Sequence, residues 1–168
     1  MEIRETDIGI EVTTSTYRLH LERAGGFAVR QVEIFGPGRL DRFDRPGEGP
    51  HPTCMHFDNI TVNNAFQLAH YGKTNSDVTA AIAGSEVTLA GQLIPIIDGT
   101  SGNVGIRKKM RFEGDMYEVD MELSFGDAGP IDYVSVWWDV NDKWLRAMRS
   151  SAGIFMPPWI EVPVSGWR

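Results

Sequence analysis

The chain alternates apolar and polar side chains over many short stretches. In residues 16–23, the apolar side chains of Tyr17, Leu19 and Leu21 are separated by charged or polar ones. Such a pattern is typical of a strand that buries one face and exposes the other to water. Stretches of this kind, bounded by Gly and Pro, predict strands at 8–14, 16–23, 27–35, 55–62, 78–83, 86–93, 104–113, 116–125, 131–141 and 153–157.

Helical periodicity is nearly absent from the chain. The best candidate for a helix, residues 64–71, spans only about two turns. The pattern therefore predicts an all-β fold, an antiparallel β-sandwich with at most one or two short helices. We expect one domain over residues 1–168, with a long Gly- and Pro-rich loop at 36–52 and an extended C-terminal tail at 156–168.

The firmest local prediction is a hairpin that turns at Gly114 and Asp115. Glycine in the first turn position suits a two-residue turn that needs positive φ. With this turn, residues whose numbers sum to 229 lie opposite each other. One register then joins three pairs of opposite charge and three apolar pairs: Arg111–Glu118, Lys109–Asp120, Arg107–Glu122, Phe112–Tyr117, Met110–Val119 and Ile106–Leu123.

Lys108 breaks this pattern, because it falls on the apolar face opposite Met121. Two interpretations stay open. Its stem packs on the sheet while its ammonium reaches water at an edge, or its charge lines a concave ligand pocket.

Composition narrows the classes of function. The formal net charge is −7, which disfavours nucleic acid as a partner. A single cysteine permits no internal disulfide, and neither a signal peptide nor a membrane-spanning run is visible. We therefore expect a cytoplasmic protein that does not bind membranes.

A window of polar residues between 55 and 71 holds the first candidate site. On a strand over 55–62, His56 and Asp58 share one face, so they could act as a base and its orienting carboxylate. The remaining donors and acceptors suit a hydroxyl-rich ligand: Asn63, Asn64, Gln67, His70 and Tyr71. The alternative is structural: Asn63 and Asn64 form a turn, and His70 caps a short helix.

A second candidate surface lies on the stretch 131–141. Alternation places Tyr133, Trp137 and Asp139 on one face, where a flat aromatic ring and a carboxylate suit a sugar ring. The alternative is that the tail or another subunit covers Trp137. Around Cys54, His51 and His56 match no known metal motif, so we expect no metal and no cofactor.

The order of three stretches resembles galactose-mutarotase-like supersandwich domains: TYRLHLE, GGFAVRQVEIFG and the long pair VTLAGQLIPIIDGTSGNVGIRKKMRFEGDMYEVDMELSF. Such domains occur in sugar epimerases and as accessory domains of glycoside hydrolases and polysaccharide lyases. The resemblance implies a sandwich fold and carbohydrate chemistry. This chain is shorter than those domains, and the epimerases' His and Glu cannot be placed on it.

Three hypotheses follow. The first is a carbohydrate-related isomerase or lyase that transfers protons through His56 or His70, with Tyr71 and Asp58 assisting and Trp137 stacking on a sugar-like ligand. The second is a non-catalytic accessory subunit or binding module, acting as a homo-oligomer or within a larger complex. The third is a small β-barrel that binds an apolar ligand.

Overall fold

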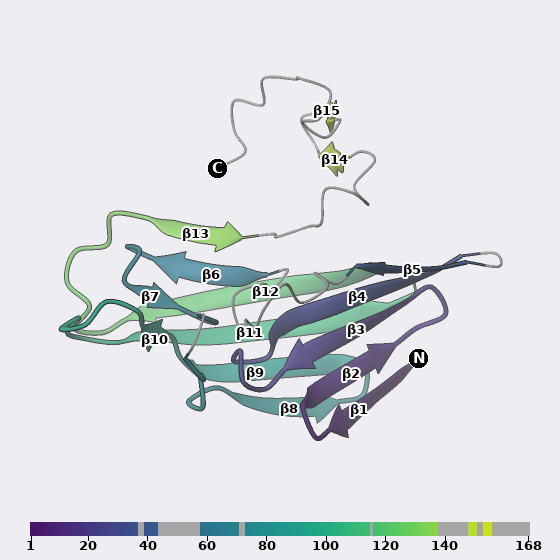
Figure 1. The fold of residues 1–168 in the computed structure, drawn as a ribbon, viewed down its shortest axis with the longest axis horizontal. Coiled ribbons are helices and arrows are strands. Elements are labelled where there is room, and N and C mark those ends of the chain that lie inside the picture. Colours follow the sequence, from purple (N-terminus) through teal and green to yellow (C-terminus); the bar gives the residue numbers. More distant parts are fainter. Residues whose placement is uncertain are drawn as a thin grey trace.

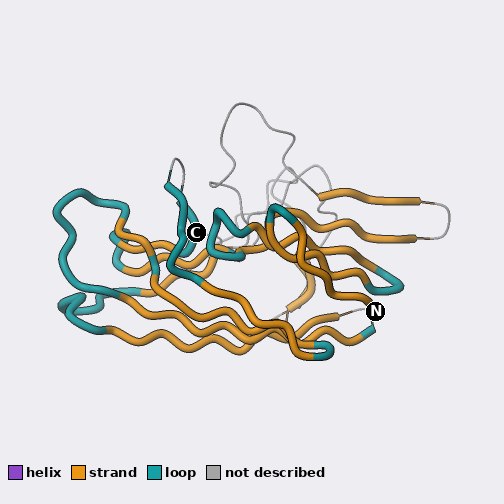
Figure 2. Tube along the Cα trace, turned by 90° about the horizontal axis from the view of Figure 1, so that it is seen from below, coloured by secondary structure: helices purple, strands orange, loops and turns teal. Residues whose placement is uncertain are grey.

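The structure, a computed structural model, describes residues 1–36, 39–43, 58–70, 73–114, 116–137, 148–150 and 153–155. All regular elements of these residues are strands, as Figures 1 and 2 show. Every pairing between strands is antiparallel, so the predicted all-β class is confirmed. Across these ranges no helix has the length and apolar character needed to cross a membrane.

The N-terminal sheet is a meander in which each strand pairs with the next along the chain. Its strands are β1 (Glu2–Thr6), β2 (Gly9–Thr13), β3 (Tyr17–Glu22), β4 (Ala28–Gly36) and β5 (Arg39–Phe43). The predicted alternation holds in β3, where Tyr17, Leu19 and Leu21 are buried and their neighbours are half-buried. One irregularity interrupts the pairing of β3 with β4 between His20 and Leu21, where Arg30 is the extra residue of a bulge in β4.

A second sheet holds the predicted hairpin. Its order is β12-β11-β9-β8, with β8 (Thr79–Ala83), β9 (Glu86–Gln92), β11 (Val104–Glu113) and β12 (Met116–Phe125). All six predicted pairs lie opposite each other, and Gly114 has a φ of 54°. The register and the need for glycine at the turn are therefore confirmed.

A third sheet is built from shorter strands. Its order is β10-β7-β6-β13, with β6 (Asn59–Val62), β7 (Phe66–Gln67), β10 (Ile94–Pro95) and β13 (Val134–Trp137). A separate pair joins β14 (Met148–Ser150) to β15 (Gly153–Phe155).

The three larger sheets share one apolar core. The cluster of buried residues draws on each of them, for example Leu19 from β3, Ile60 from β6 and Met110 from β11. Sheets that pack their inner faces together in this way define a β-sandwich (Figure 2). The sheets have open ends in the described residues, so nothing there supports the barrel alternative.

Two predictions about local structure are wrong. Residues 64–70 form a turn and strand β7 instead of a helix, because Asn63 and Asn64 adopt positive φ and reverse the chain. The predicted loop at 36–52 contains strand β5, which extends the edge of the first sheet. The tail 156–168 lies outside the described residues.

Candidate functional site

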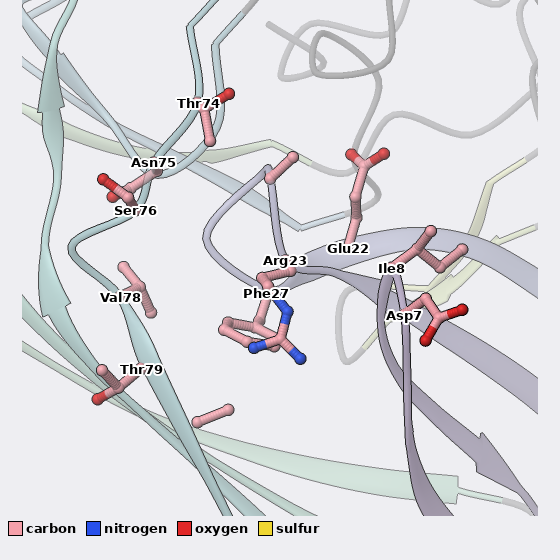
Figure 3. A pocket seen from close by; sticks show the side chains of 12 residues that line it. Asp7, Ile8, Glu22, Arg23, Phe27, Thr74, Asn75, Ser76, Val78 and Thr79 are labelled. Atoms are coloured by element: carbon pink, nitrogen blue, oxygen red, sulfur yellow. The ribbon is translucent and has the colours of Figure 1, made fainter.

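A pocket of about 660 Å³ opens between the first two sheets. Three segments surround it: the β1–β2 turn, the β3–β4 turn and the stretch leading into β8 (Figure 3). We call it the Arg23 pocket. Its lining residues are Asp7, Ile8, Glu22, Arg23, Ala24, Phe27, Thr74, Asn75, Ser76, Val78, Thr79 and Ala80. A cavity of this size accommodates an ordinary small ligand.

Backbone hydrogen bonds hold the three segments together. The amide of Arg23 donates to the carbonyl of Ile8 at 2.8 Å, and the amide of Asn75 donates to the carbonyl of Ala24 at 2.9 Å. The buried Asn75 side chain also donates to the carbonyls of Leu68 and Gln92, at 2.9 and 3.0 Å. The walls of the pocket are thus held in place before any ligand binds.

Arg23 occupies the middle of the pocket. Its guanidinium carbon lies 5.3 Å from the centre of the Phe27 ring, a cation–π arrangement that Figure 3 shows from nearby. Phe27 is buried and has a φ of 59°, a conformation that is unfavourable for a bulky side chain. The strained backbone of this turn places the Phe27 ring beside the Arg23 guanidinium. Backbone strain of this kind is concentrated at functional sites.

Several polar groups of the pocket remain available. Within the described residues, neither the Asp7 carboxylate nor the Arg23 guanidinium forms an ion pair, and the hydroxyls of Thr74 and Ser76 have no hydrogen-bond partner. Ile8 lies on the rim with 68% of its surface exposed. The pocket therefore combines an acceptor, a forked donor, two hydroxyls and an apolar contact.

A second chemical feature lies in the core. The Lys108 ammonium, with no exposed surface, pairs with the Asp58 carboxylate, whose other oxygen accepts a 2.6 Å hydrogen bond from the amide of Val29. This contact joins the three sheets, because Val29 belongs to β4, Lys108 to β11, and Asp58 directly precedes β6. Lys108 neither reaches water nor lines the Arg23 pocket.

Complete burial lowers the pKa of Lys108 to about 7, because removal from water disfavours the charged ammonium. Both Asp58 oxygens are engaged, one by the Val29 amide and one by Lys108. The pair is therefore a structural connection between the sheets.

The remaining predicted site residues are only partly gathered. Asn63 serves the turn: its amide donates to the carbonyl of Pro130 at 2.8 Å and its oxygen accepts from the amides of Asp132 and Tyr133. With the positive φ of both asparagines, this confirms the turn expected at Asn63 and Asn64, whereas the described residues 58–70 contain no helix for His70 to cap. Gln67 is half-buried in β7. The Nδ1 atom of His70 is buried and lacks a hydrogen-bond partner within the described part of the chain.

Some predicted residues cannot be placed. His56, Tyr71 and Asp139 lie outside the described residues, as do His51 and Cys54. Trp137 is described only through its backbone, at the end of β13 opposite Asn59. Among the residues that are described, no three His, Cys, Asp or Glu side chains gather in a way that could hold a metal ion.

Sequence reasoning missed the Arg23 pocket altogether. Its residues belong to turns far apart along the chain, and only folding brings Asp7, Arg23 and Ser76 together. One local signal was present: Gly25 and Gly26 precede Phe27, and such a pair favours unusual backbone geometry.

The fold and the pocket define a class, an antiparallel β-sandwich domain with a preformed pocket that both polar and apolar side chains line. Comparison with known protein families, curated proteins and solved structures finds no match for this chain.

Proposed function

We propose that this domain binds a small hydroxyl-rich ligand of the carbohydrate type in the Arg23 pocket. The observation that carries the proposal is the unpaired Arg23 guanidinium, held over Phe27 in the pocket. A guanidinium can donate two parallel hydrogen bonds to neighbouring sugar oxygens, and the Asp7 carboxylate can accept from a hydroxyl. Exposed Ile8 offers an apolar contact for the C–H groups of a sugar ring.

An NMR titration with neutral mono- and oligosaccharides tests the proposal. We expect the amide signals of residues 7–8, 23–27 and 74–80 to shift together in the presence of at least one sugar. Arg23→Ala should weaken the binding at least tenfold, since removing one charged hydrogen-bond partner costs about 1.5–3 kcal/mol.

Arg107→Ala is the matched control for this titration. Arg107 is an exposed arginine of β11 that lies outside the pocket, 4.0 Å from the carboxylate of Glu122. Its removal should leave sugar binding unchanged. Shifts confined to other surfaces, or equal losses in both variants, would count against the Arg23 pocket as the site.

A second candidate is catalytic, an isomerase or lyase that moves protons through a histidine. The buried, unpartnered Nδ1 atom of His70 supports it. Asp58 does not suit the role of orienting carboxylate, because the Val29 amide and Lys108 occupy its oxygens. If the second candidate holds, His70→Gln abolishes turnover of a bound sugar and leaves its affinity intact.

A further inference from the structure

Strand β12 lies at the edge of its sheet. In the described part of the chain β12 pairs only with β11, over ten residues. Glu113 and Met116 flank the two-residue turn and form its closing pair, so the backbone groups of residues 118, 120 and 122 point toward β11. The amides and carbonyls of Tyr117, Val119, Met121 and Leu123 therefore point outward, where another strand could pair with them.

The inner face of the same edge is apolar and incompletely covered. Tyr117, Val119, Met121 and Leu123 all pack against the core, yet all four are only half-buried. The opposing β11 residues Met110 and Phe112 are, by contrast, fully buried. Burial thus decreases from β11 to β12, which leaves apolar surface for one more strand to cover.

The outer face of the edge is acidic. The side chains of Glu118, Asp120 and Glu122 are 72%, 62% and 76% exposed. Charge alternates from strand to strand across this sheet: Glu86 on β9 pairs with Lys109 and Arg111 on β11, and Arg111 pairs in turn with Asp120 on β12. A strand beside β12 would continue this alternation if it were basic.

A second copy of this chain does not suit the edge. Pairing β12 with its own copy would place Glu118, Asp120 and Glu122 opposite further carboxylates, and like charges directly opposed are destabilising. The net charge of −7 adds to this repulsion, whereas it attracts a basic partner.

We propose that the outer edge of β12 binds an extended strand of a partner protein in which basic and apolar side chains alternate. Its backbone pairs with the outward groups of Tyr117, Val119, Met121 and Leu123. Its apolar side chains cover this inner row, and its basic side chains meet the three carboxylates. The mode is strand addition to an exposed edge, in which the side-chain alternation sets specificity.

Amide hydrogen exchange of the whole chain, with two synthetic decapeptides, tests this proposal. One peptide alternates Lys and Val, and the other alternates Glu and Val. We expect the Lys-Val peptide to slow exchange at residues 117, 119, 121 and 123 at least tenfold, and the Glu-Val peptide to have no effect. The amides of 118, 120 and 122 already bond to β11 and serve as an internal reference. Equal protection by both peptides, or none by either, overturns the proposal.

Two variants separate strand addition from general charge attraction. Val119→Pro removes an outward amide that β11 does not use, so it should abolish peptide binding while the hairpin remains. Val119→Ala keeps the amide and should still bind. Unimpaired binding by Val119→Pro, with the hairpin register verified from β11 exchange, overturns strand addition.

Charge reversal provides the complementary test. The triple variant Glu118→Lys, Asp120→Lys, Glu122→Lys should no longer bind the Lys-Val peptide and should bind the Glu-Val peptide instead. Because the new lysines would lie opposite Arg111, Lys109 and Arg107, some loss of stability is expected, so the hairpin register is first verified from the exchange of the β11 amides. Unchanged peptide preference, or β12 amides protected in a self-associated protein without peptide, contradicts the assignment of a basic partner.

Discussion

At the scale of single residues, Lys108 and Asp58 show how a charge is accommodated in an apolar core. Each ion alone would be costly to bury, but together with the Val29 amide they satisfy each other. The sequence reveals Lys108 as an exception on an apolar face, and it places Asp58 among candidate site residues. It does not reveal that the two meet, because fifty positions separate them.

Removing one member of the pair should destabilise the protein strongly. At pH 6, where Lys108 holds its proton, Lys108→Met leaves a buried carboxylate without its cation, so we expect a loss of about 3–5 kcal/mol in the free energy of unfolding. The double variant Lys108→Met, Asp58→Asn removes both charges and should lose much less. Urea denaturation of Lys108→Met, of Asp58→Asn and of the double variant measures this coupling. If the losses of unfolding free energy in the two single variants add up to the loss in the double variant, the coupling is contradicted.

The lowered pKa of Lys108 also predicts a dependence of stability on pH. Its pKa is about 7 in the folded protein and 10.5 when unperturbed. Between these values the unfolded chain binds more protons, so the unfolding free energy should rise with pH, by at most about 1.4 kcal/mol per unit. Below pH 7 both states hold the proton and this contribution is constant. Denaturation at pH 6, 7.5 and 9 should show the rise in the native protein and not in the double variant.

At the scale of elements, the close approach of another backbone segment explains why strand β9 contains a glycine, Gly91. A Cβ atom on Gly91 would fall within contact distance of the Asp77 carbonyl and 2.6 Å from the Cα of Val78. The chain must therefore pass directly over this strand before it enters β8 and forms one wall of the Arg23 pocket.

Gly91→Ala should thus destabilise the fold more than a substitution of alanine for a glycine in a turn. Gly84→Ala is the comparison: Gly84 has a φ of 59° and no atoms near its Cβ position, so its substitution costs about 1–2 kcal/mol in strain alone. We expect Gly91→Ala to cost more and to displace the amide signals of residues 77–80. Thermal unfolding and NMR spectra of the two variants check this order.

Local pattern predicts some elements well and others poorly for physical reasons. The hairpin of β11 and β12 follows from its sequence because adjacent residues set its register. The sequence pattern does not predict strand β5, because its residues lie among Gly and Pro and become extended by pairing with β4. The pattern does not predict the Arg23 pocket either, since the pocket depends on contacts between distant turns.

At the scale of the whole molecule, the shared core predicts cooperative unfolding. Leu19, Val62 and Leu89 belong to three different sheets and to one buried cluster. We expect their amides to exchange with similar free energies of opening, close to the global value. Hydrogen exchange at low denaturant concentration checks this; clearly different values for the three sheets would indicate separate folding units.

The salt bridge between β11 and the start of β6 also bears on the rate at which the protein comes apart. Lys108 and Asp58 are fifty residues apart along the chain, and Asp58 and Val29 are 29 residues apart. Because closing so long a loop costs chain entropy before the contact is gained, we expect this bridge to form late along the folding route. Loss of this bridge should therefore shorten the lifetime of the native state while leaving the speed of its formation nearly unaltered.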